Sequence, residues 1–281
     1  KAANTKFNQL TWIGFTSNAT KRTVFYLDNI TAFRCDIANL EDVEAKVAEV
    51  ERSLGPVDLL MHAAALMPSF LLSEHTHENM ERLFRINYFG TTYMVRAVLP
   101  SMTARGEGRI VAFGSIAGVA LVPKMGAYCA TKSAVNTYIE VLQNEIRKTG
   151  VRAHLVCPPA VNTPLVDQTI ETDTPGSIVE AKKAGRLADP EKMIDAIEKG
   201  LAKGKDVIVI DEGATLPGGE VGGPPLRAVV LEDSAAGDHL GHAVDVLLLR
   251  QGAQNFRVDK DGQWLAEGAD QIFAMCCIDS G

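Results

Sequence analysis

The chain has 281 residues, of which 46% are hydrophobic, enough for one large domain or two small ones with an ordinary core. Its formal net charge of −7 argues against a nucleic-acid partner and against an anionic membrane surface. No apolar run approaches the roughly 18 residues of a membrane span, and the start of the chain lacks the apolar stretch of a signal peptide.

Short apolar runs alternate with longer amphipathic runs over most of the chain. The apolar runs predict buried strands at Val57–Met61, Arg109–Phe113, Val151–Val156 and Val207–Ile210. The amphipathic runs predict helices at Leu40–Leu54, about Thr76–Met102, Ala127–Thr149 and Pro190–Lys203. This alternation predicts an α/β fold, a doubly wound, Rossmann-like parallel sheet with helices on both faces.

A stretch rich in glycine and proline at residues 212–226 indicates a linker. Beyond it we expect a strand at Ala228–Leu231, a helix that ends at about Arg250, and a strand at Asn255–Val258. Residues 1–29 contain strand-like runs that follow no recognisable pattern, and we leave them unassigned.

The cysteines indicate a reducing environment. They are Cys35, Cys129, Cys157, Cys276 and Cys277. The count is odd, no C-x-x-C pair occurs, and the two adjacent cysteines are poorly placed to bridge each other. We therefore expect a cytoplasmic protein with free thiols rather than a disulfide scaffold.

Ser115, Tyr128 and Lys132 have a spacing that suits proton transfer. Tyr128 and Lys132 are four residues apart near the start of a predicted helix, so their side chains share one face. A phenol has a reference pKa of about 10. A nearby ammonium lowers that pKa, so the pair can exchange a proton near neutral pH. Ser115 follows a predicted strand, at the carboxyl end where open α/β sheets bind ligands.

The segment Tyr128-Cys-Ala-Thr-Lys132 resembles the Y-x-x-x-K motif of the short-chain dehydrogenase/reductase family, and Ser115 stands at the family's spacing upstream. Asn87, within RLFRINYFG, matches the family's fourth catalytic residue, which anchors a water in the proton relay. The resemblance implies an oxidoreductase that transfers a hydride between NAD(P) and a secondary alcohol or ketone. It implies no metal, and it is our ground for expecting a homodimer or homotetramer.

The same resemblance implies several cofactor contacts. The segment Cys35-Asp36-Ile37 resembles the strand-end element whose acid touches the adenine, and residues 157–163 resemble the stretch that holds the nicotinamide carboxamide. His62-Ala63-Ala64-Ala65 stands where the family has Asn-Asn-Ala-Gly, and we interpret His62 as a packing or capping residue at a strand end. The cofactor-binding residues implied by these elements are Asp36, Ala64, Pro158, Val161 and Thr163.

The family's glycine-rich cofactor loop is absent from residues 1–35, where a dinucleotide would need glycines to let the backbone approach its pyrophosphate. Residues 227–261 offer a strand, a small-residue loop, a helix and a strand that ends in an acid, although Asp233 stands where the first glycine is expected. The loop residues are Ser234, Gly237 and Gly241. The acid, Asp259, is spaced to bind the adenine ribose hydroxyls and would repel a 2′-phosphate, so we expect NAD rather than NADP.

We therefore expect residues 227–281 to complete the catalytic core at residues 30–211, as the first β-α-β unit of the same sheet. In that arrangement Ala228–Leu231 lies parallel to the neighbouring strands in the centre of the sheet. The octapeptides Asp28–Cys35 and Asp270–Cys277 agree at four positions, which indicates a rearranged chain order, a fragment of a tandem repeat, or chance.

Two questions stay open in the sequence. The altered loop and the altered His62 element also fit a non-catalytic dinucleotide-binding or interaction protein derived from the family. The resemblance implies only that the substrate is a secondary alcohol or ketone. An apolar wall for it is suggested by Ile116, Leu121, Met125 and Leu165.

Overall fold

The computed structural model describes residues 30–170, 172–173 and 175–209 and four C-terminal strands. The described strands are β1 (Ile30–Cys35), β2 (Leu59–His62), β3 (Gly108–Phe113), β4 (Val151–Cys157), β5 (Val207–Val209), β6 (Val244–Leu249), β7 (Asn255–Val258), β8 (Trp264–Glu267) and β9 (Ile272–Cys277). The described helices are α1 (Leu40–Leu54), α2 (His77–Leu83), the π-helix η1 (Phe84–Gly90), α3 (Thr91–Arg105), the 3₁₀-helix η2 (Ile116–Gly118), α4 (Gly126–Glu145), α5 (Pro164–Ile170), α6 (Gly176–Lys183) and α7 (Pro190–Ala202).

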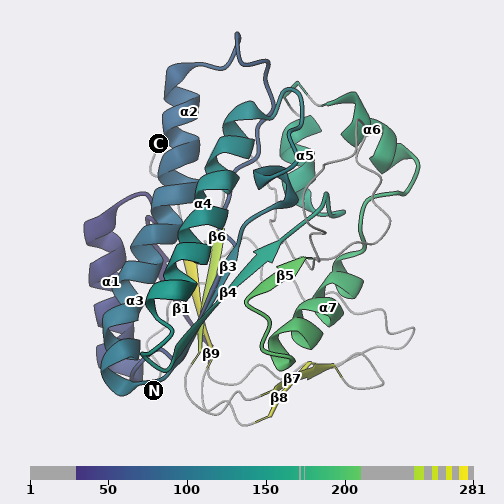
Figure 1. Cartoon of the computed structure of the whole chain (residues 1–281). Helices are drawn as coiled ribbons and strands as arrows, with labels where there is room; N and C mark the ends of the chain where they lie inside the picture. Colours follow the sequence, from purple (N-terminus) through teal and green to yellow (C-terminus); the bar gives the residue numbers. More distant parts are fainter. Residues whose placement is uncertain are drawn as a thin grey trace.

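A seven-stranded sheet has the order β1-β9-β6-β2-β3-β4-β5. Strands β2 to β5 are paired in parallel, and helices α1, α3 and α4 lie side by side over one face of the sheet (Figure 1). Helix α7 packs on β5, where a Cβ on Gly200 would meet the side chain of Ile208 at 2.8 Å. The predicted α/β, Rossmann-like architecture is confirmed.

The predicted elements of the core are present, with differences mainly at their ends. Helix α1 covers Leu40–Leu54, as predicted. The single helix predicted at about Thr76–Met102 is divided into α2, η1 and α3, because a π-helical segment interrupts it. Asp189 caps α7 by accepting a hydrogen bond from the backbone N–H of Glu191 at 2.9 Å, and Pro190 suits the first helical position because an N–H there would have no partner within the helix.

The C-terminal segment enters the sheet in an arrangement that differs from the predicted one. Strands β6 and β9 lie between β1 and β2, and β6 is antiparallel to both of its neighbours. The predicted helix ending at about Arg250 is wrong, since Val244–Leu249 is a strand. Its sequence VDVLLL is apolar except for Asp245, and periodicity cannot distinguish so short a run from a buried helix, so pairing on both edges decides the outcome.

The end of the predicted β-α-β unit also differs. Asn255–Val258 is a strand, as predicted, but it pairs with β8 in a separate two-stranded sheet instead of joining the main one. The predicted strand Ala228–Leu231 lies outside the described residues.

Strands β1 and β9 bring the two similar octapeptides together. They pair in parallel, with identical residues opposite each other: Ile30 with Ile272, Ala32 with Ala274, and Cys35 with Cys277. A similarity between distant parts of the sequence is thus a similarity between neighbouring strands of one sheet.

The described core has two hydrophobic clusters. The larger includes Leu60, Ile110 and Leu155 on adjacent strands, all fully buried. The smaller surrounds Tyr128 at the carboxyl end of the sheet, and its other buried members are Met67, Met125, Cys129, Leu165, Val166 and Ile178. Tyr128 therefore sits in an apolar environment separate from the main core.

Candidate active site

Ser115, Tyr128 and Lys132 lie near the carboxyl end of β3. Ser115 follows this strand and caps η2, accepting a hydrogen bond from the backbone N–H of Ala117 at 3.0 Å. Tyr128 and Lys132 are one turn apart near the start of α4 and share a helix face, as the spacing predicts. The three side chains are 5%, 1% and 2% exposed, respectively, so this is a site largely shielded from water.

Lys132 connects α4 to β3. Its Nζ donates a hydrogen bond to the carbonyl oxygen of Phe113 at 2.9 Å, two residues before Ser115. The same Nζ lies 5.8 Å from the centroid of the Tyr128 ring. A cation held at this place favours the ionised form of a neighbouring phenol, which is the condition for proton exchange near neutral pH.

Asn136 fixes the position of Ser115, a role that we did not predict. Its Oδ1 accepts a hydrogen bond from the Ser115 N–H at 3.3 Å, and its Nδ2 donates to the Ser115 carbonyl at 3.0 Å. A Cβ atom at Gly114 would lie 1.9 Å from Oδ1 of Asn136, and a Cβ atom at Gly118 would lie 2.4 Å from its Nδ2. The Asn136 side chain therefore has room in this position only because both residues are glycines. The signal in the sequence was spacing, because Asn136 lies four residues after Lys132 on the same helix face.

Asn87 lies in the π-helix η1 and is fully buried. Its Oδ1 accepts from the N–H of Leu66 at 2.7 Å, and its Nδ2 donates to the Leu66 carbonyl at 2.9 Å and to Thr131 Oγ1 at 3.0 Å. The side chain therefore ties the segment after β2 to α4, next to Lys132. Interruptions of this π-helical type are frequent at functional sites.

His62 is the last residue of β2 and is only 1% exposed. Among the described residues, neither ring nitrogen has a hydrogen-bond partner. Its burial agrees with the packing interpretation, but the described residues show no capping hydrogen bond from it. Burial, with a smaller contribution from the charge of Lys132, lowers the pKa of His62 to about 3, so the imidazole is neutral near pH 7.

The cofactor-binding residues expected in the core follow the carboxyl ends of three strands. They are Asp36 after β1, Ala64 after β2, and Pro158, Val161 and Thr163 after β4. The carbonyl of Pro158 accepts a hydrogen bond from the N–H of Ile116 at 2.8 Å, which holds the end of β4 against the Ser115 segment. The other expected residues, Ser234, Gly237, Gly241 and Asp259, lie outside the described part of the chain.

The structure agrees with the apolar substrate wall suggested by the sequence at two of its four positions. Met125 and Leu165 belong to the cluster around Tyr128. Leu121 is 85% exposed and Ile116 packs against the larger core cluster, so neither of them belongs to the buried cluster around Tyr128. Hydrophobicity alone could not separate these cases, because the turn between η2 and α4 decides which side chains point outward.

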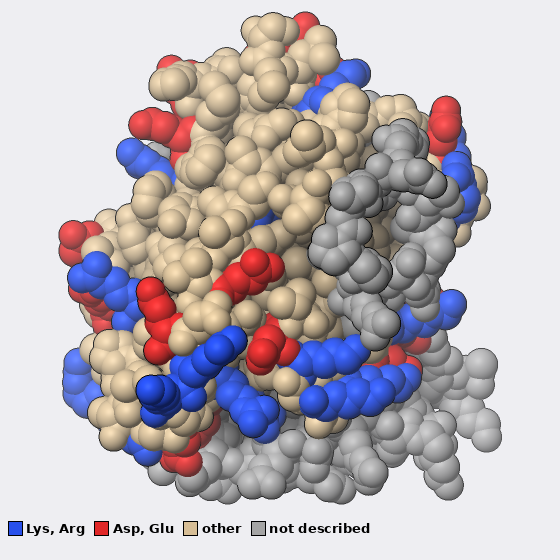
Figure 2. Space-filling model, viewed as in Figure 1, with Lys and Arg blue, Asp and Glu red and all other residues tan. Residues whose placement is uncertain are grey.

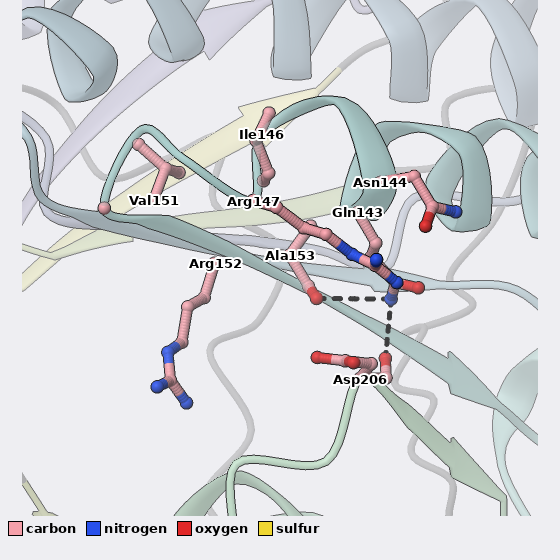
Figure 3. A pocket seen from close by; sticks show the side chains of 9 residues that line it. Gln143, Asn144, Ile146, Arg147, Val151, Arg152, Ala153 and Asp206 are labelled. Atoms are coloured by element: carbon pink, nitrogen blue, oxygen red, sulfur yellow. Dashed lines mark hydrogen bonds between the residues drawn. The ribbon is translucent and has the colours of Figure 1, made fainter.

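A surface cavity of about 390 Å³ lies at the opposite, amino end of β4. Arg147, Arg152 and Asp206 line it, and Gln143 crosses it with hydrogen bonds to the carbonyls of Ala153 and Asp206 (Figure 3). It contains none of the expected catalytic residues. Within the described residues, no group of three or more His, Cys, Asp or Glu could hold a metal, and no helix is long and apolar enough to cross a membrane.

Comparison with known proteins agrees with the fold and with the family that the sequence resembles. A family model described as short chain dehydrogenase matches residues 13–174, beginning upstream of the core that we expected from residue 30. An uncharacterized oxidoreductase of Staphylococcus saprophyticus is 36% identical over 134 residues, which cover 48% of this chain and 57% of that protein. The chain therefore spans somewhat more than half the length of this relative.

Two solved structures share the fold at similar coverage. A short-chain dehydrogenase/reductase from Burkholderia phymatum in complex with NAD has a TM-score of 0.55 and 25% identity, over 62% of this chain and 68% of that one. A gluconate 5-dehydrogenase from Burkholderia cenocepacia in complex with NADP and tartrate has a TM-score of 0.50 and 27% identity, over 55% and 61%.

Proposed function

Since the chain belongs to the short-chain dehydrogenase family, we propose that it is an NAD(P)-dependent oxidoreductase that interconverts a secondary alcohol and a ketone. The observation that carries the proposal is the buried pair on α4, Tyr128 and Lys132, with Lys132 bonded to the end of β3 two residues before Ser115. The proposed catalytic residues are Ser115, Tyr128, Lys132 and Asn87.

Each of these residues has a task that its surroundings support. Tyr128 gives a proton to the substrate oxygen in reduction and takes it back in oxidation, while Lys132 stabilises the phenolate. The Ser115 hydroxyl orients the substrate oxygen, and Asn136 keeps Ser115 in place. Asn87 holds the segment after β2 against α4, beside Lys132.

The nicotinamide end of the cofactor fits the residues at this edge. Lys132 and Thr163 would hold it, and the orphaned ring nitrogens of His62 leave polar groups for a further contact. The bound cofactor supplies or accepts the hydride. We propose NAD as the preferred cofactor because of Asp259, with residues 227–281 completing the adenine side. Strands β6 and β9 lie between β1 and β2, which supports a contribution of this segment to the same sheet, although β6 is antiparallel and does not reproduce the expected parallel unit. We propose that this arrangement reflects a permuted or tandem-derived chain order.

The surroundings of Tyr128 favour an apolar substituent on the substrate carbon. Besides Tyr128 itself, the buried members of this cluster carry only thioether, thiol and aliphatic side chains. They are Met67, Met125, Cys129, Leu165, Val166 and Ile178. A charged substituent placed there would lose its hydration without a partner. We therefore propose an uncharged alcohol or ketone as substrate.

We also propose that the protein is a homo-oligomer and that it works in the reducing cytoplasm. In Figure 2 the middle of the face over α4 is largely uncharged, and Lys, Arg, Asp and Glu gather near its lower end. On η1 and α4, Phe89 is 42% exposed and Val141 is 50% exposed. Phe89 also stacks on Tyr93, with ring centroids 5.9 Å apart, and aromatic side chains are enriched at protein–protein interfaces. Cys35, Cys129 and Cys157 are free thiols, which suits a reducing compartment.

A fluorescence titration tests the proposal directly. NADH and NADPH are titrated into the protein, and then a panel of apolar ketones is screened for cofactor oxidation. Binding followed by turnover is expected. Binding without turnover on any ketone favours the non-catalytic alternative, which the altered element His62–Ala65 supports. Absence of any binding would reject both functions.

A further inference from the structure

Three exposed leucines lie on the two loops that flank the start of α4. Leu71 and Leu72, in the loop between β2 and α2, are 43% and 66% exposed, and Leu121, on the turn between η2 and α4, is 85% exposed. We call these three residues the outer leucines. A single exposed apolar side chain is ordinary on a protein surface, whereas several on adjoining loops mark a binding surface.

The two loops are joined beside the catalytic tyrosine. The backbone N–H of Phe70 donates a hydrogen bond to the carbonyl oxygen of Lys124 at 2.8 Å. The side chain of Leu72 lies over Gly126, where a Cβ atom would meet its Cδ2 at 2.6 Å. Because Gly126 begins α4 two residues before Tyr128, Leu72 lies within one helical turn of the proposed proton donor.

Both loops also contribute side chains to the Tyr128 cluster. Met67 precedes the two leucines of the first loop, and Met125 ends the turn before α4; both are buried in the cluster. Val122, the residue after Leu121, packs against the same cluster. Each loop therefore leads from an apolar side chain in the Tyr128 cluster to a leucine at the surface within a few residues.

We propose that the outer leucines bind the hydrocarbon tail of the substrate, which is a long-chain secondary alcohol or ketone. The inference rests on the proposed function, which places the substrate oxygen at Tyr128 and an apolar substituent in its cluster. A short substituent ends within the cluster, whereas a long one continues to the surface, where apolar side chains would shield it from water. The charge of Lys124, on the same turn, is balanced by Asp173 at 2.5 Å, which suits an uncharged tail.

Steady-state kinetics with a series of methyl ketones, from 2-butanone to 2-dodecanone, test the proposal. We expect kcat/KM to increase about fourfold for each methylene group that the outer leucines cover. Leu72→Gln should reduce the ratio of kcat/KM for 2-decanone to that for 2-butanone about tenfold, and Leu121→Gln should reduce it in the same direction. Val141→Gln is the matched control, because Val141 is also an exposed apolar residue but lies much further along α4, and it should keep the wild-type ratio. A ratio that does not depend on chain length, or that falls equally in Val141→Gln, would overturn the proposal.

A second measurement needs neither cofactor nor turnover. In saturation-transfer difference spectra of 2-decanone, the terminal methyl group receives magnetisation from the protein side chains that it contacts. We expect this signal with the wild-type protein and with Val141→Gln, and a weaker signal with Leu72→Gln. Equal signals with all three proteins would overturn the proposal.

Other occupants of the outer leucines would give different results. For a lipid surface, the wild-type protein would sediment with phosphatidylcholine vesicles, Leu72→Gln would not, and kcat/KM would be independent of chain length. For a second copy of the chain, Leu72→Gln would reduce the molar mass, again with no dependence on chain length. Either result overturns the proposal. If no ketone is turned over, the proposed function fails, and the 2-decanone spectra still decide whether the outer leucines bind a hydrocarbon tail.

Discussion

Lys132 Nζ lies 2.9 Å from the carbonyl oxygen of Phe113, so the ammonium is anchored to the strand end that leads to Ser115. This contact joins the helix that carries the tyrosine to the strand that leads to the serine. Because the lysine is 2% exposed, its charge acts on Tyr128 with little screening by water.

Tyr128→Phe should retain the fold and NADH binding but lower kcat by a factor of about 10² to 10⁴, the usual contribution of a general acid. The phenol oxygen is the only part removed. Steady-state rates on the best ketone of the screen measure the effect. Tyr138→Phe, on the same helix with its ring packed edge-on against Tyr88, should keep wild-type kcat. A kcat near wild type in Tyr128→Phe would remove this tyrosine from the mechanism.

Lys132→Met should lower kcat by a similar factor and also raise the Kd for NADH, because one ammonium serves both tasks. Steady-state rates and fluorescence titrations measure the two effects separately. A variant with impaired turnover and unchanged NADH affinity would limit the lysine to proton transfer.

Asn136→Ala should destabilise the protein by about 1–3 kcal/mol, because it leaves the buried N–H of Ser115 without its partner and removes one of the two hydrogen bonds that the Ser115 carbonyl accepts, the other coming from the Gly118 N–H. It should also raise KM, since Ser115 is then free to move. Urea denaturation and steady-state kinetics measure the two effects. Asn144→Ala is the matched control, because Asn144 is exposed on the same helix and bonds only locally to the Glu140 carbonyl. Equal losses in both variants would contradict a role for Asn136 at the site.

Stability should increase with pH between about 3 and 6.5 through His62. In the unfolded chain the imidazole takes up a proton below its ordinary pKa of 6.5, whereas in the folded protein its pKa is lowered to about 3. The unfolded state therefore binds more protons in this window, and acidification from pH 7 to pH 5 should cost about 2 kcal/mol. Burial also lowers the pKa of His75 and His154, which adds slope in the same direction.

Urea denaturation at pH 5, 6 and 7 measures the slope. His62→Asn should flatten it by one proton's contribution, about 1.4 kcal/mol per pH unit at most. A slope that is identical in wild type and His62→Asn would mean that His62 is protonated in the folded protein.

Asp259→Ser should weaken NADH binding and strengthen NADPH binding, because the carboxylate no longer holds the ribose hydroxyls or repels a 2′-phosphate. Titrations with both cofactors measure the ratio of the two Kd values. Asp261→Ser, two residues on, is the matched control and should leave the ratio unchanged. Tighter binding of NADPH than NADH by the wild-type protein would contradict the assignment of Asp259.

Phe89→Asp should reduce the molar mass measured by light scattering, since it places a charge on the proposed oligomer surface. Leu121→Asp changes a still more exposed apolar residue on the turn between η2 and α4 and should leave the mass unchanged. A monomeric wild-type protein would reject the oligomer proposal.

Local spacing in the sequence was enough to predict most of the core and the centre of the site. Helix α1, the strands of the core and the shared face of Tyr128 and Lys132 follow from periodicity and from the geometry of one helix, which act over a few residues. The same is true of the helix start at Asp189.

Tertiary structure decided what depends on distant partners. Val244–Leu249 is a strand because β2 and β9 pair with its edges, and nothing within the six residues distinguishes that from a helix. Asn136 has its role because Gly114 and Gly118 make room for its amide, and Leu121 is exposed because it lies on the turn between η2 and α4. His62 becomes a neutral, unmatched group only when β2 places it in the interior beside the charge of Lys132. Burial, pairing and the field of a charge are properties of the assembled chain, so short-range patterns in the sequence do not contain them.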